Sequence, residues 1–493
     1  MALLSEVQSY YGRLKFFIDG EWVESKSTTV YPVTNPAKGE VIAEVPSATK
    51  EEIEAAVEAA QRGFERWSKV PLRDKARLMW NLRGKFEEHF EELARVLTQD
   101  HGRTIEESRG SVRRVIENIE AACSSMYSVA KGEQVNSLAS GIDESLIWEP
   151  LGVFLIITPG NIPMHAWSSF VPYAIACGCA VIVSPSRQAP VATNWVTKVT
   201  EEVGFTPGVV NLIHGGREVN KALLSHPKVK GVGFIGSTSV GRELFKLAGE
   251  LGKRASINGN GKNCIVVMPD ADLDRATEYL MRGCYGMSGQ RCLGTDNVII
   301  VGDVYEEVKN RFVEASSRMK LGYGLDEETE LGPMTTEQGR QKVIDWVETG
   351  IKEGAKIILD RRNEKVKDYP KGYFFGPTIL EEVSPDMTIA KEEAFGPVAN
   401  LLRARSLDEA IEWINTKTNY GHSACILTSS GKNARKFTQE VQVGNIGINL
   451  GIPQPYAFFP LGSKRDSFFG TAHSRIDSVR LFMDQKTVTM RWV

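Results

Sequence analysis

The sequence predicts an α/β protein with two lobes and a small β-extension. Two separate series of short apolar strands alternate with helices, and the C-terminal residues 486–493 alternate like a strand outside either series. Alternation of this kind produces a parallel sheet covered by helices on both faces, with ligands beyond the carboxyl ends of the strands. The length of 493 residues is sufficient for two or three domains.

The first half of the chain begins with a predicted hairpin and turn at 16–36. Residues 50–70, 72–102 and 105–132 are predicted helices, because apolar residues recur at helical spacing on a charged background. From 151 to 258, short apolar strands such as "GVFLIITPG" and "AVIVSPS" alternate with helices. This stretch is the first of the two series.

The second series begins near "NCIVVMPDAD" (263–272) and continues through "NVIIVG", "AKIILD", "ACILTSS" and "GNIGINL". The two series together indicate two lobes with a cleft between them. The terminal strand at 486–493 has no neighbour in sequence that would pair with it. A strand needs a partner edge, and we expect another subunit to supply it.

The composition is that of an ordinary globular protein, with 42% hydrophobic residues, 25% charged residues and a net charge of −3. This balance gives no general attraction for nucleic acid or an anionic membrane. A secretory signal and a membrane-spanning segment are both missing from the pattern, so a cytoplasmic protein without membrane partners is expected. The seven cysteines are scattered without a CxxC pair, and neither a disulfide framework nor a metal site is expected.

Two loops after predicted strands carry groups suited to ligand binding. "FIGSTSVG" (234–241) opens a helix, whose free N–H groups would suit a pyrophosphate. The spacing is not GxGxxG, and a plain tight turn is the other reading of the stretch. "TPGNIP" (158–163) contains Asn161, whose side-chain amide would stabilise a developing oxyanion. Taken alone, Asn161 is also a common turn or cap residue.

Cys292 lies in "YGMSGQRCLG" (285–294), a small and flexible stretch. A free cysteine is usually a buried apolar filler, and that reading applies to most of the seven thiols. Here Gly286, Ser288 and Gly289 allow close approach, and Arg291 together with a cationic cofactor would stabilise a thiolate. Both the filler and the nucleophile remain open from these residues alone.

These stretches, in this order and with "EEAFGPV" (392–398), resemble the aldehyde dehydrogenase superfamily over nearly the whole chain. The resemblance implies that Cys292 is the nucleophile of an NAD(P)-dependent enzyme. It implies that Asn161 and the backbone N–H of Cys292 form the oxyanion hole, and that Glu393 and Phe395 hold the nicotinamide ribose and ring. The other cofactor-binding positions implied are Thr158, Pro159, Ser184, Arg187, Gly236 and Ser237.

The resemblance also implies a domain division. A Rossmann-like cofactor domain would comprise 1–131 and 148–257, and the catalytic domain would comprise 258–455. Residues 132–147 and 479–493 would be oligomerisation strands, with a return segment at 456–478. A homotetramer built as a dimer of dimers is expected.

One residue departs from the hydrolytic pattern of the superfamily. Hydrolytic members carry a glutamate in a Glu-Leu-Gly-Gly-Lys stretch, where it activates water against the thioester. The matching stretch here is "NGNGK" (258–262), with Asn258 in place of the acid. An amide cannot accept a proton near neutral pH, so a thioester would persist until a thiol attacks it. This points to a CoA-acylating subgroup with coenzyme A as co-substrate.

The chain resembles the methylmalonate-semialdehyde dehydrogenase subgroup in "VVMPDAD", "EAACS", "IPQPYAFFPLGSKRDSFFG" and "QKTVTMRW". Substrates of that subgroup carry a carboxylate, which arginine pairs with through two hydrogen bonds. Arg114 and Arg291 match the carboxylate-binding positions, although the first register could slip to Arg113. Malonate or methylmalonate semialdehyde would give acetyl-CoA or propionyl-CoA with loss of carbon dioxide. The alternatives are an enzyme that releases the free acid, an NADP-preferring enzyme for another small aldehyde, and a silent scaffold.

Four further departures concern the pocket. Ser184 and Arg187 stand where the family usually has Lys and Glu on the adenosine ribose, which removes repulsion toward a 2′-phosphate and leaves NAD against NADP undecided. Gly160 replaces an aromatic residue and is expected to open space. Asn260 replaces a glycine.

Overall fold

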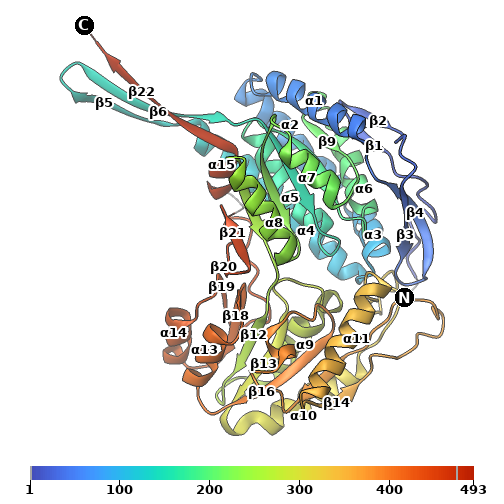
Figure 1. The fold of residues 1–493 in the computed structure, drawn as a ribbon. Helices are drawn as coiled ribbons and strands as arrows, with labels where there is room; N and C mark the ends of the chain where they lie inside the picture. The colour runs from blue at the N-terminus through green and yellow to red at the C-terminus, as the bar shows by residue number, and fades with distance from the viewer. Residues whose placement is uncertain (1–2, 473–475, 493) are drawn as a thin grey trace.

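The computed structural model describes residues 3–472 and 476–492 and consists of two stacked lobes with a sheet projecting from one of them (Figure 1). Residues 473–475 of the predicted return segment and residue 493 of the predicted terminal strand lie outside the described residues. Both lobes contain a mainly parallel sheet, so the predicted α/β class is confirmed.

The first lobe contains an eight-stranded sheet in which the five central strands are parallel. In spatial order the strands are β2 (Glu21–Val23), β1 (Phe16–Ile18), β9 (Val210–Leu212), β8 (Ala180–Pro185), β7 (Val153–Thr158), β10 (Val229–Ile235), β11 (Arg254–Asn258) and β21 (Phe468–Gly470). The central strands read as continuous apolar runs because both faces of the sheet are covered.

Two layers of helices cover this sheet, and alternate residues of each strand enter different cores. Leu155 and Ile157 of β7 pack on the side of α1 (Lys50–Trp67), α7 (Arg217–Ser225) and α8 (Thr238–Glu250). Phe154 and Ile156 pack on the opposite side. The helices of that side are α2 (Leu72–Glu88), α3 (Phe90–His101), α4 (Ile105–Ala130), α5 (Pro163–Ala176), α6 (Val191–Glu201) and α15 (Ile476–Phe482).

The single helix predicted at 72–102 is wrong, because the chain forms α2 and α3 with a break at His89. The φ and ψ of His89 are −92° and 15°, outside the α-helical region. Its ring nitrogens are held by Glu92 at 2.7 Å and by Glu202 of another helix at 3.0 Å. A tertiary contact therefore ends the helix where no proline or glycine marks the sequence.

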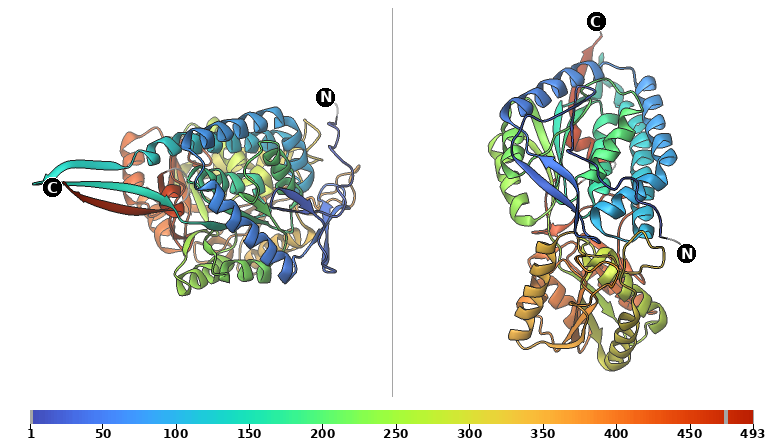
Figure 2. Two further views of the ribbon diagram at one scale, coloured as in Figure 1. Left: turned by 90° about the horizontal axis from the view of Figure 1, so that it is seen from above. Right: turned by 90° about the vertical axis from the view of Figure 1, so that its right-hand side faces the viewer.

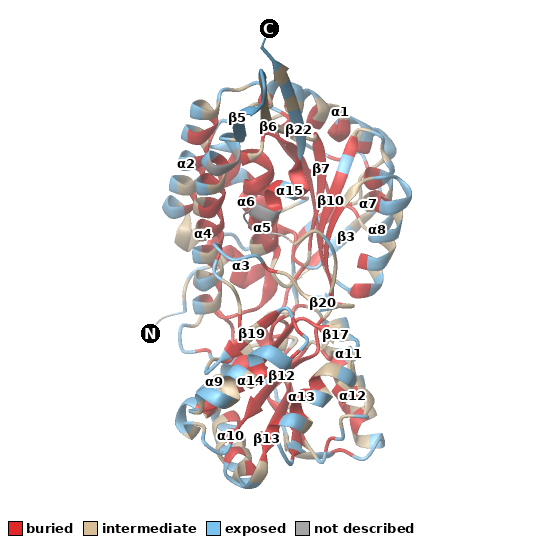
Figure 3. Cartoon of the chain, turned by 90° about the vertical axis from the view of Figure 1, so that its left-hand side faces the viewer, coloured by how far each residue is buried: buried red, intermediate tan, exposed pale blue. Residues whose placement is uncertain are grey.

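The second lobe contains a seven-stranded sheet that is parallel except at one edge. In spatial order its strands are β14 (Lys356–Asp360), β15 (Thr378–Glu381), β16 (Val398–Ala404), β13 (Thr295–Val301), β12 (Asn263–Val267), β18 (Ser423–Leu427) and β19 (Asn445–Ile448). The helices of this lobe are α9 (Leu273–Tyr285), α10 (Tyr305–Arg318), α11 (Glu337–Lys352), α12 (Thr388–Lys391), α13 (Leu407–Thr416) and α14 (Gly431–Glu440). Buried residues fill the middle of both lobes (Figure 3).

The two lobes share one continuous core. Ile265 and Val267 of β12 belong to the same buried cluster as Phe154 and Ile156 of β7. Burial of about 25 cal/mol for each Å² of apolar surface makes such a shared core a strong restraint on lobe orientation. The two sheets therefore meet in a fixed geometry where the loops between them face each other.

A three-stranded antiparallel sheet projects from the first lobe (Figure 2). It consists of β5 (Glu133–Ala139), β6 (Ile142–Pro150) and β22 (Met483–Arg491), in the order β22-β6-β5. The expectation that 486–493 pairs with another subunit is corrected, because Met483 to Arg491 pair with β6 of the same chain. Residues 479–482 belong to helix α15 and not to a strand.

Three smaller features complete the fold. A hairpin of β3 (Val30–Asn35) and β4 (Glu40–Pro46) follows the N-terminal strands, and β17 (Tyr420–Gly421) pairs with β20 (Lys464–Arg465). Short 3-10 turns occur at η1 (Gly286–Gly289) and η2 (Gly302–Val304). Across the described ranges, no helix has the length and apolarity needed to cross a bilayer.

Candidate active site

Three neighbouring parallel strands of the first lobe end at one edge of the sheet. β7, β10 and β11 lie side by side, with Ile235 of β10 opposite Asn258 of β11. The loop after β7 carries Asn161. The second lobe faces this edge with the loops 286–294 and 392–396, so polar groups from both lobes converge between them.

The loop before Cys292 is held in a strained conformation. Met287 and Ser288 both have a φ of 55°, in the left-handed region that costs a non-glycine residue roughly 1–2 kcal/mol. The Met287 N–H donates to the Glu107 carboxylate at 2.6 Å, and the Ser288 hydroxyl donates to the Gly332 carbonyl oxygen at 2.8 Å. These contacts hold the turn that presents the thiol.

A close backbone approach joins this loop to the loop of Glu393. A Cβ atom on Gly289 would lie 2.0 Å from the carbonyl oxygen of Gly396. Gly289 also has a φ of 68°, so only glycine fits there without displacement. The approach places Cys292 and Glu393 on two loops in direct contact.

Glu107 links the start of α4 to the same loop. Its N–H donates to the Thr104 hydroxyl at 3.3 Å, while its carboxylate accepts the Thr104 N–H at 3.1 Å, which is a capping box. Its other oxygen accepts from Met287. The charge of Glu107 also opposes the effect of burial, which lowers the pKa of Arg291.

Arg103 lies directly behind Asn161. Its guanidinium is fully buried and donates to the backbone carbonyl oxygen of Asn161 and, at 2.7 Å, to the Ser111 hydroxyl. Burial lowers the pKa of Arg103 to about 9. The Asn161 side-chain amide donates to the carbonyl oxygen of Gln290 at 2.9 Å, two residues before Cys292. Within residues 3–472 and 476–492 the amide nitrogen donates only this hydrogen bond, which leaves its second hydrogen for a ligand.

Two cavities meet at Cys292. The first, which we call the arginine cavity, has a volume of about 250 Å³. The second, which we call the Glu393 cavity, has a volume of about 300 Å³. The arginine cavity includes Arg114, Arg291, Asn258, His165, Gln454 and Cys292. The Glu393 cavity includes Pro159, Asn161, Gly236, Ser237, Asn260, Cys292, Glu393 and Phe395.

The arginine cavity has two guanidinium groups on its wall. Arg291 donates to the Gln454 side chain at 3.0 Å. Arg114 pairs with Glu117 at 2.6 Å, and its guanidinium carbon lies 4.8 Å from the ring centre of Tyr456. Arg113, the other register considered, is exposed and is absent from the cavity wall. The structure therefore places Arg114 and Arg291 together beside the thiol.

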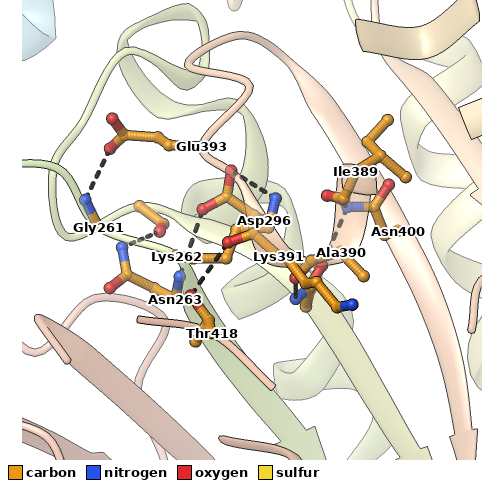
Figure 4. Close-up of polar contacts among 12 residues, drawn as sticks. Gly261, Lys262, Asn263, Asp296, Ile389, Ala390, Lys391, Glu393, Asn400 and Thr418 are labelled. Carbon is orange, nitrogen blue, oxygen red and sulfur yellow. Dashed lines mark hydrogen bonds and ion pairs between the residues drawn. The ribbon is translucent and has the colours of Figure 1, made fainter. Parts of the chain in front are cut away.

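Glu393 is held by neutral donors, of which Figure 4 shows Gly261. The backbone N–H of Gly261 donates to one carboxylate oxygen at 3.1 Å, and the side-chain amide of Asn260 donates to the other. The Asn260 side-chain oxygen accepts the N–H of Thr238 at 2.6 Å, at the start of α8. Burial, assisted by the charge of Asp296, raises the pKa of Glu393 to about 8.

The surroundings of Cys292 act on its thiol in opposite directions. Burial and the charge of Glu393 raise the pKa of Cys292 to about 11, while Arg291 lowers it. Among the described cysteines, five are buried and only Cys177 and Cys292 are partly exposed. The thiol is therefore accessible but protonated until a further positive charge is supplied.

Three predicted cofactor positions lie outside these two cavities. Thr158 and Ser184 are buried at the ends of their strands, and no described residue hydrogen-bonds to the Ser184 hydroxyl. Arg187 is exposed and stacks 4.0 Å from the ring centre of Tyr31. Gly160 lines the Glu393 cavity, and a Cβ there would lie 2.9 Å from the Gln188 side chain, which lines the same cavity.

Several site residues were missed by sequence reasoning. They are Arg103, Glu107, His165, Gln290 and Gln454. The Thr-x-x-Glu spacing at 104–107 is a capping-box signal that would have located Glu107 at a helix start. The others depend on tertiary contacts that no local pattern records.

The model of the aldehyde dehydrogenase family matches residues 22–488. The chain belongs to this family. Malonate-semialdehyde dehydrogenase 1 of Geobacillus thermodenitrificans is 40% identical to this aldehyde dehydrogenase over 480 residues, which is 97% of this chain and 99% of the relative. The resemblance predicted from the sequence is thereby confirmed.

Solved structures agree with this aldehyde dehydrogenase over almost the whole chain. Methylmalonate-semialdehyde dehydrogenase of Oceanimonas doudoroffii has a TM-score of 0.95 at 34% identity, covering 98% of this chain and 99% of its own. Betaine aldehyde dehydrogenase of Staphylococcus aureus, solved with NAD⁺, has a TM-score of 0.92 at 29% identity, covering 97% and 94%. The protein is thus an enzyme that oxidises an aldehyde with a nicotinamide cofactor.

Proposed function

We propose that this aldehyde dehydrogenase oxidises a small carboxylated aldehyde of the malonate or methylmalonate semialdehyde type and transfers the acyl group to CoA. The observation that carries the proposal is the arginine cavity, which is lined by Arg114 and Arg291 together with Cys292 and Asn258. Two arginines bind a carboxylate, and an amide at 258 cannot activate water. The names of the relatives agree with this substrate class.

Cys292 attacks the aldehyde carbon, and the Asn161 amide with the Cys292 N–H stabilises the alkoxide. The nicotinamide cofactor supplies the hydride acceptor when bound. The residues expected to bind this cofactor fit the role. Ser184 offers a buried hydroxyl to which no described residue bonds. Gly236, before the start of α8, has no room for a side chain, since a Cβ there would lie 2.5 Å from the Phe234 ring. Glu393 and Phe395 would flank the nicotinamide end.

The acyl group then resides on Cys292 as a thioester. With a malonyl-type group, carbon dioxide leaves because the thioester carbonyl stabilises the resulting enolate. A thiol of CoA displaces Cys292 and yields acetyl-CoA or propionyl-CoA. The Asn258 amide leaves hydrolysis without a base at this position, which is why the thioester waits for the thiol.

Product analysis with malonate semialdehyde tests the proposal. We expect turnover and acetyl-CoA only when CoA is added, and free acetate only slowly without it. Turnover at the full rate without CoA would support the alternative, an aldehyde dehydrogenase that releases the free acid. The same assay with NAD and NADP determines which cofactor the enzyme prefers. Activity with NADP would agree with Arg187 at the adenosine ribose, since a guanidinium suits a 2′-phosphate.

We also propose that the projecting sheet of β5, β6 and β22 is an oligomerisation surface and that the enzyme is a homotetramer. Val135, Leu138 and Ile147 of this sheet are large apolar residues that are exposed in the single chain. Exposed apolar groups on a protruding sheet favour association. Light scattering of the purified enzyme measures the mass directly, and a monomer would contradict the proposal.

A further inference from the structure

We propose that Glu393 is the base that takes the proton from the attacking thiol when the acyl group leaves Cys292. The inference rests on the proposed function, in which that acyl group passes to CoA. The attacking species must be a thiolate, because a thiol is a poor nucleophile. A thiol bound in a closed site therefore needs a proton acceptor, and Asn258 cannot serve.

The geometry places the carboxylate on the wall of a cavity that opens at the thiol. Glu393 and Cys292 line the same cavity. Gly261 stands between them: its N–H donates to Glu393, and a Cβ on it would lie 2.6 Å from the Cys292 carbonyl oxygen. Asn263 donates to that same carbonyl oxygen at 2.8 Å. One short segment, residues 261–263, thus contacts both Glu393 and the Cys292 backbone.

The carboxylate has lone pairs left for a proton. Each oxygen accepts one hydrogen bond from a neutral donor, Asn260 or Gly261. Within residues 3–472 and 476–492, no lysine or arginine forms an ion pair with it, whereas Asp296 is paired with Lys262 at 3.3 Å. A carboxylate without a cationic partner is the more basic of the two.

The charged and titratable groups around Glu393 set its proton affinity. Burial and Asp296 raise the pKa of Glu393 to about 8, and Lys262 lowers it. The charge of Glu393 raises the pKa values of Cys292 and Tyr420, and Lys342 lies on the same cavity wall. Proton transfer is most efficient when base and acid have similar pKa values, and a free thiol lies near 8.5.

The proton balance of the step is complete without a co-reactant. The S–H bond of CoA breaks and its proton passes to the Glu393 carboxylate. The thiolate forms a bond to the thioester carbon, and the C–S bond to Cys292 then breaks. The Cys292 thiolate leaves and takes the proton back from Glu393. No atom is oxidised or reduced, and the enzyme returns to its starting state.

Two other groups near the thiol compete for this role. Glu107 accepts two backbone N–H groups, from Thr104 and Met287, and so holds the loop before Cys292. It lines the arginine cavity and not the Glu393 cavity. His165 lines the arginine cavity. Because an imidazole is an effective base, His165→Gln is the matched control for the experiment.

The test follows acyl transfer alone, without nicotinamide. Cys292 is acetylated with p-nitrophenyl acetate, CoA is added, and acetyl-CoA is measured in single turnovers from about pH 6 to about 10, a range that spans the titration of a base near 8. We expect the wild-type rate to rise with an apparent pKa near 8. Glu393→Gln should lower the rate at neutral pH by about 100-fold, the lower end of general-base effects. Glu393→Asp should restore part of the rate with the same pH dependence.

The outcomes separate the two proposals. Wild-type transfer with an unchanged rate and pH profile in Glu393→Gln would overturn the role of Glu393 and leave the proposed function standing. A wild-type acetyl-enzyme that gives no acetyl-CoA would overturn the proposed function itself. Loss of the pH-dependent phase in His165→Gln, with its retention in Glu393→Gln, would assign the base to His165. Circular dichroism of both Glu393 variants checks the fold.

Discussion

The guanidinium of Arg103 donates a hydrogen bond to the backbone carbonyl oxygen of Asn161. Arg103 is fully buried, and the same guanidinium donates to the Ser111 hydroxyl at 2.7 Å. In the proposed oxyanion hole the cation would have two effects: it would fix the backbone that positions the Asn161 amide, and it would add positive potential behind that amide. A hydrogen bond from a buried charged donor is stronger than one between neutral groups.

Arg103→Met should lower kcat by about 10- to 100-fold, somewhat less than removal of an oxyanion donor itself. The KM for the nicotinamide cofactor should change little, because Arg103 stands behind Asn161 and not on the wall of the Glu393 cavity. Arg103→Lys keeps the charge and should recover part of the rate. Steady-state kinetics on the three proteins measure this, and equal losses in the Met and Lys variants would refute the electrostatic contribution.

Asn258→Glu should create hydrolytic activity. The side chain lies at the end of β11 on the wall of the arginine cavity, beside Cys292. A carboxylate there supplies the missing base, and general-base catalysis contributes about 100-fold or more. We expect acid release without CoA to rise by about that factor. Asn258→Gln, of the same size and without a base, is the control and should stay inactive toward water.

Sequence motifs located some site residues and missed others, and the difference lies in how each residue acts. Cys292, Asn161 and Glu393 lie in short loops whose sequence is dictated by close approach, as at Gly289 against Gly396. Arg103 acts through a backbone carbonyl oxygen, which any residue at 161 would supply, so no side-chain pattern records the contact.

The fold shows the same distinction. Short apolar runs that alternate with helices predicted both parallel sheets, because strands buried on both faces consist of apolar residues. The break at His89 depends on Glu202 from another helix, and the partner of the terminal strand depends on β6, more than 300 residues earlier. Alternation identifies a strand and says nothing about its neighbour. The choice between Arg113 and Arg114 likewise required the helix to be placed against the cavity.

Arg114→Leu should weaken selection for carboxylated aldehydes. Arg114 faces the arginine cavity, whereas Arg113 is exposed and pairs with Glu106 at 3.7 Å. A charged hydrogen bond contributes about 1.5–3 kcal/mol, so kcat/KM for malonate semialdehyde should fall by about 10- to 100-fold. The value for propanal should change little. Arg113→Leu is the matched control, and a substrate-independent loss in Arg114→Leu would refute carboxylate binding.

Alkylation of Cys292 should respond in opposite directions to two substitutions. Arg291 lowers the pKa of Cys292, so Arg291→Leu should raise it above about 11 and slow inactivation by iodoacetamide. Glu393 raises that pKa, so Glu393→Gln should lower it and speed inactivation at alkaline pH, where the carboxylate is charged. The rate constant as a function of pH gives both values. Shifts in the same direction would contradict the electrostatic account.

Asp100 should make the stability of the enzyme depend on pH. Its carboxyl group is fully buried, one oxygen accepts the Ala192 N–H at 2.9 Å, and no described group hydrogen-bonds to the other oxygen. Burial raises the pKa of Asp100 from its ordinary value of 3.8 to about 8. Between these two values the folded state holds a proton that the unfolded state has lost.

The contribution of Asp100 to the free energy of unfolding should therefore be largest at low pH. It should fall as the pH rises from 3.8 to about 8, by at most about 1.4 kcal/mol per pH unit. Asp100→Asn keeps the acceptor for Ala192 and removes the titration. Urea unfolding at several pH values should give a stability difference between variant and wild type that grows in favour of the variant from acid toward pH 8. Parallel plots of stability against pH for the two proteins would contradict the prediction and show that Asp100 is ionised in the folded enzyme. The N–H groups at the start of α6 would then have to offset the cost of burying its charge.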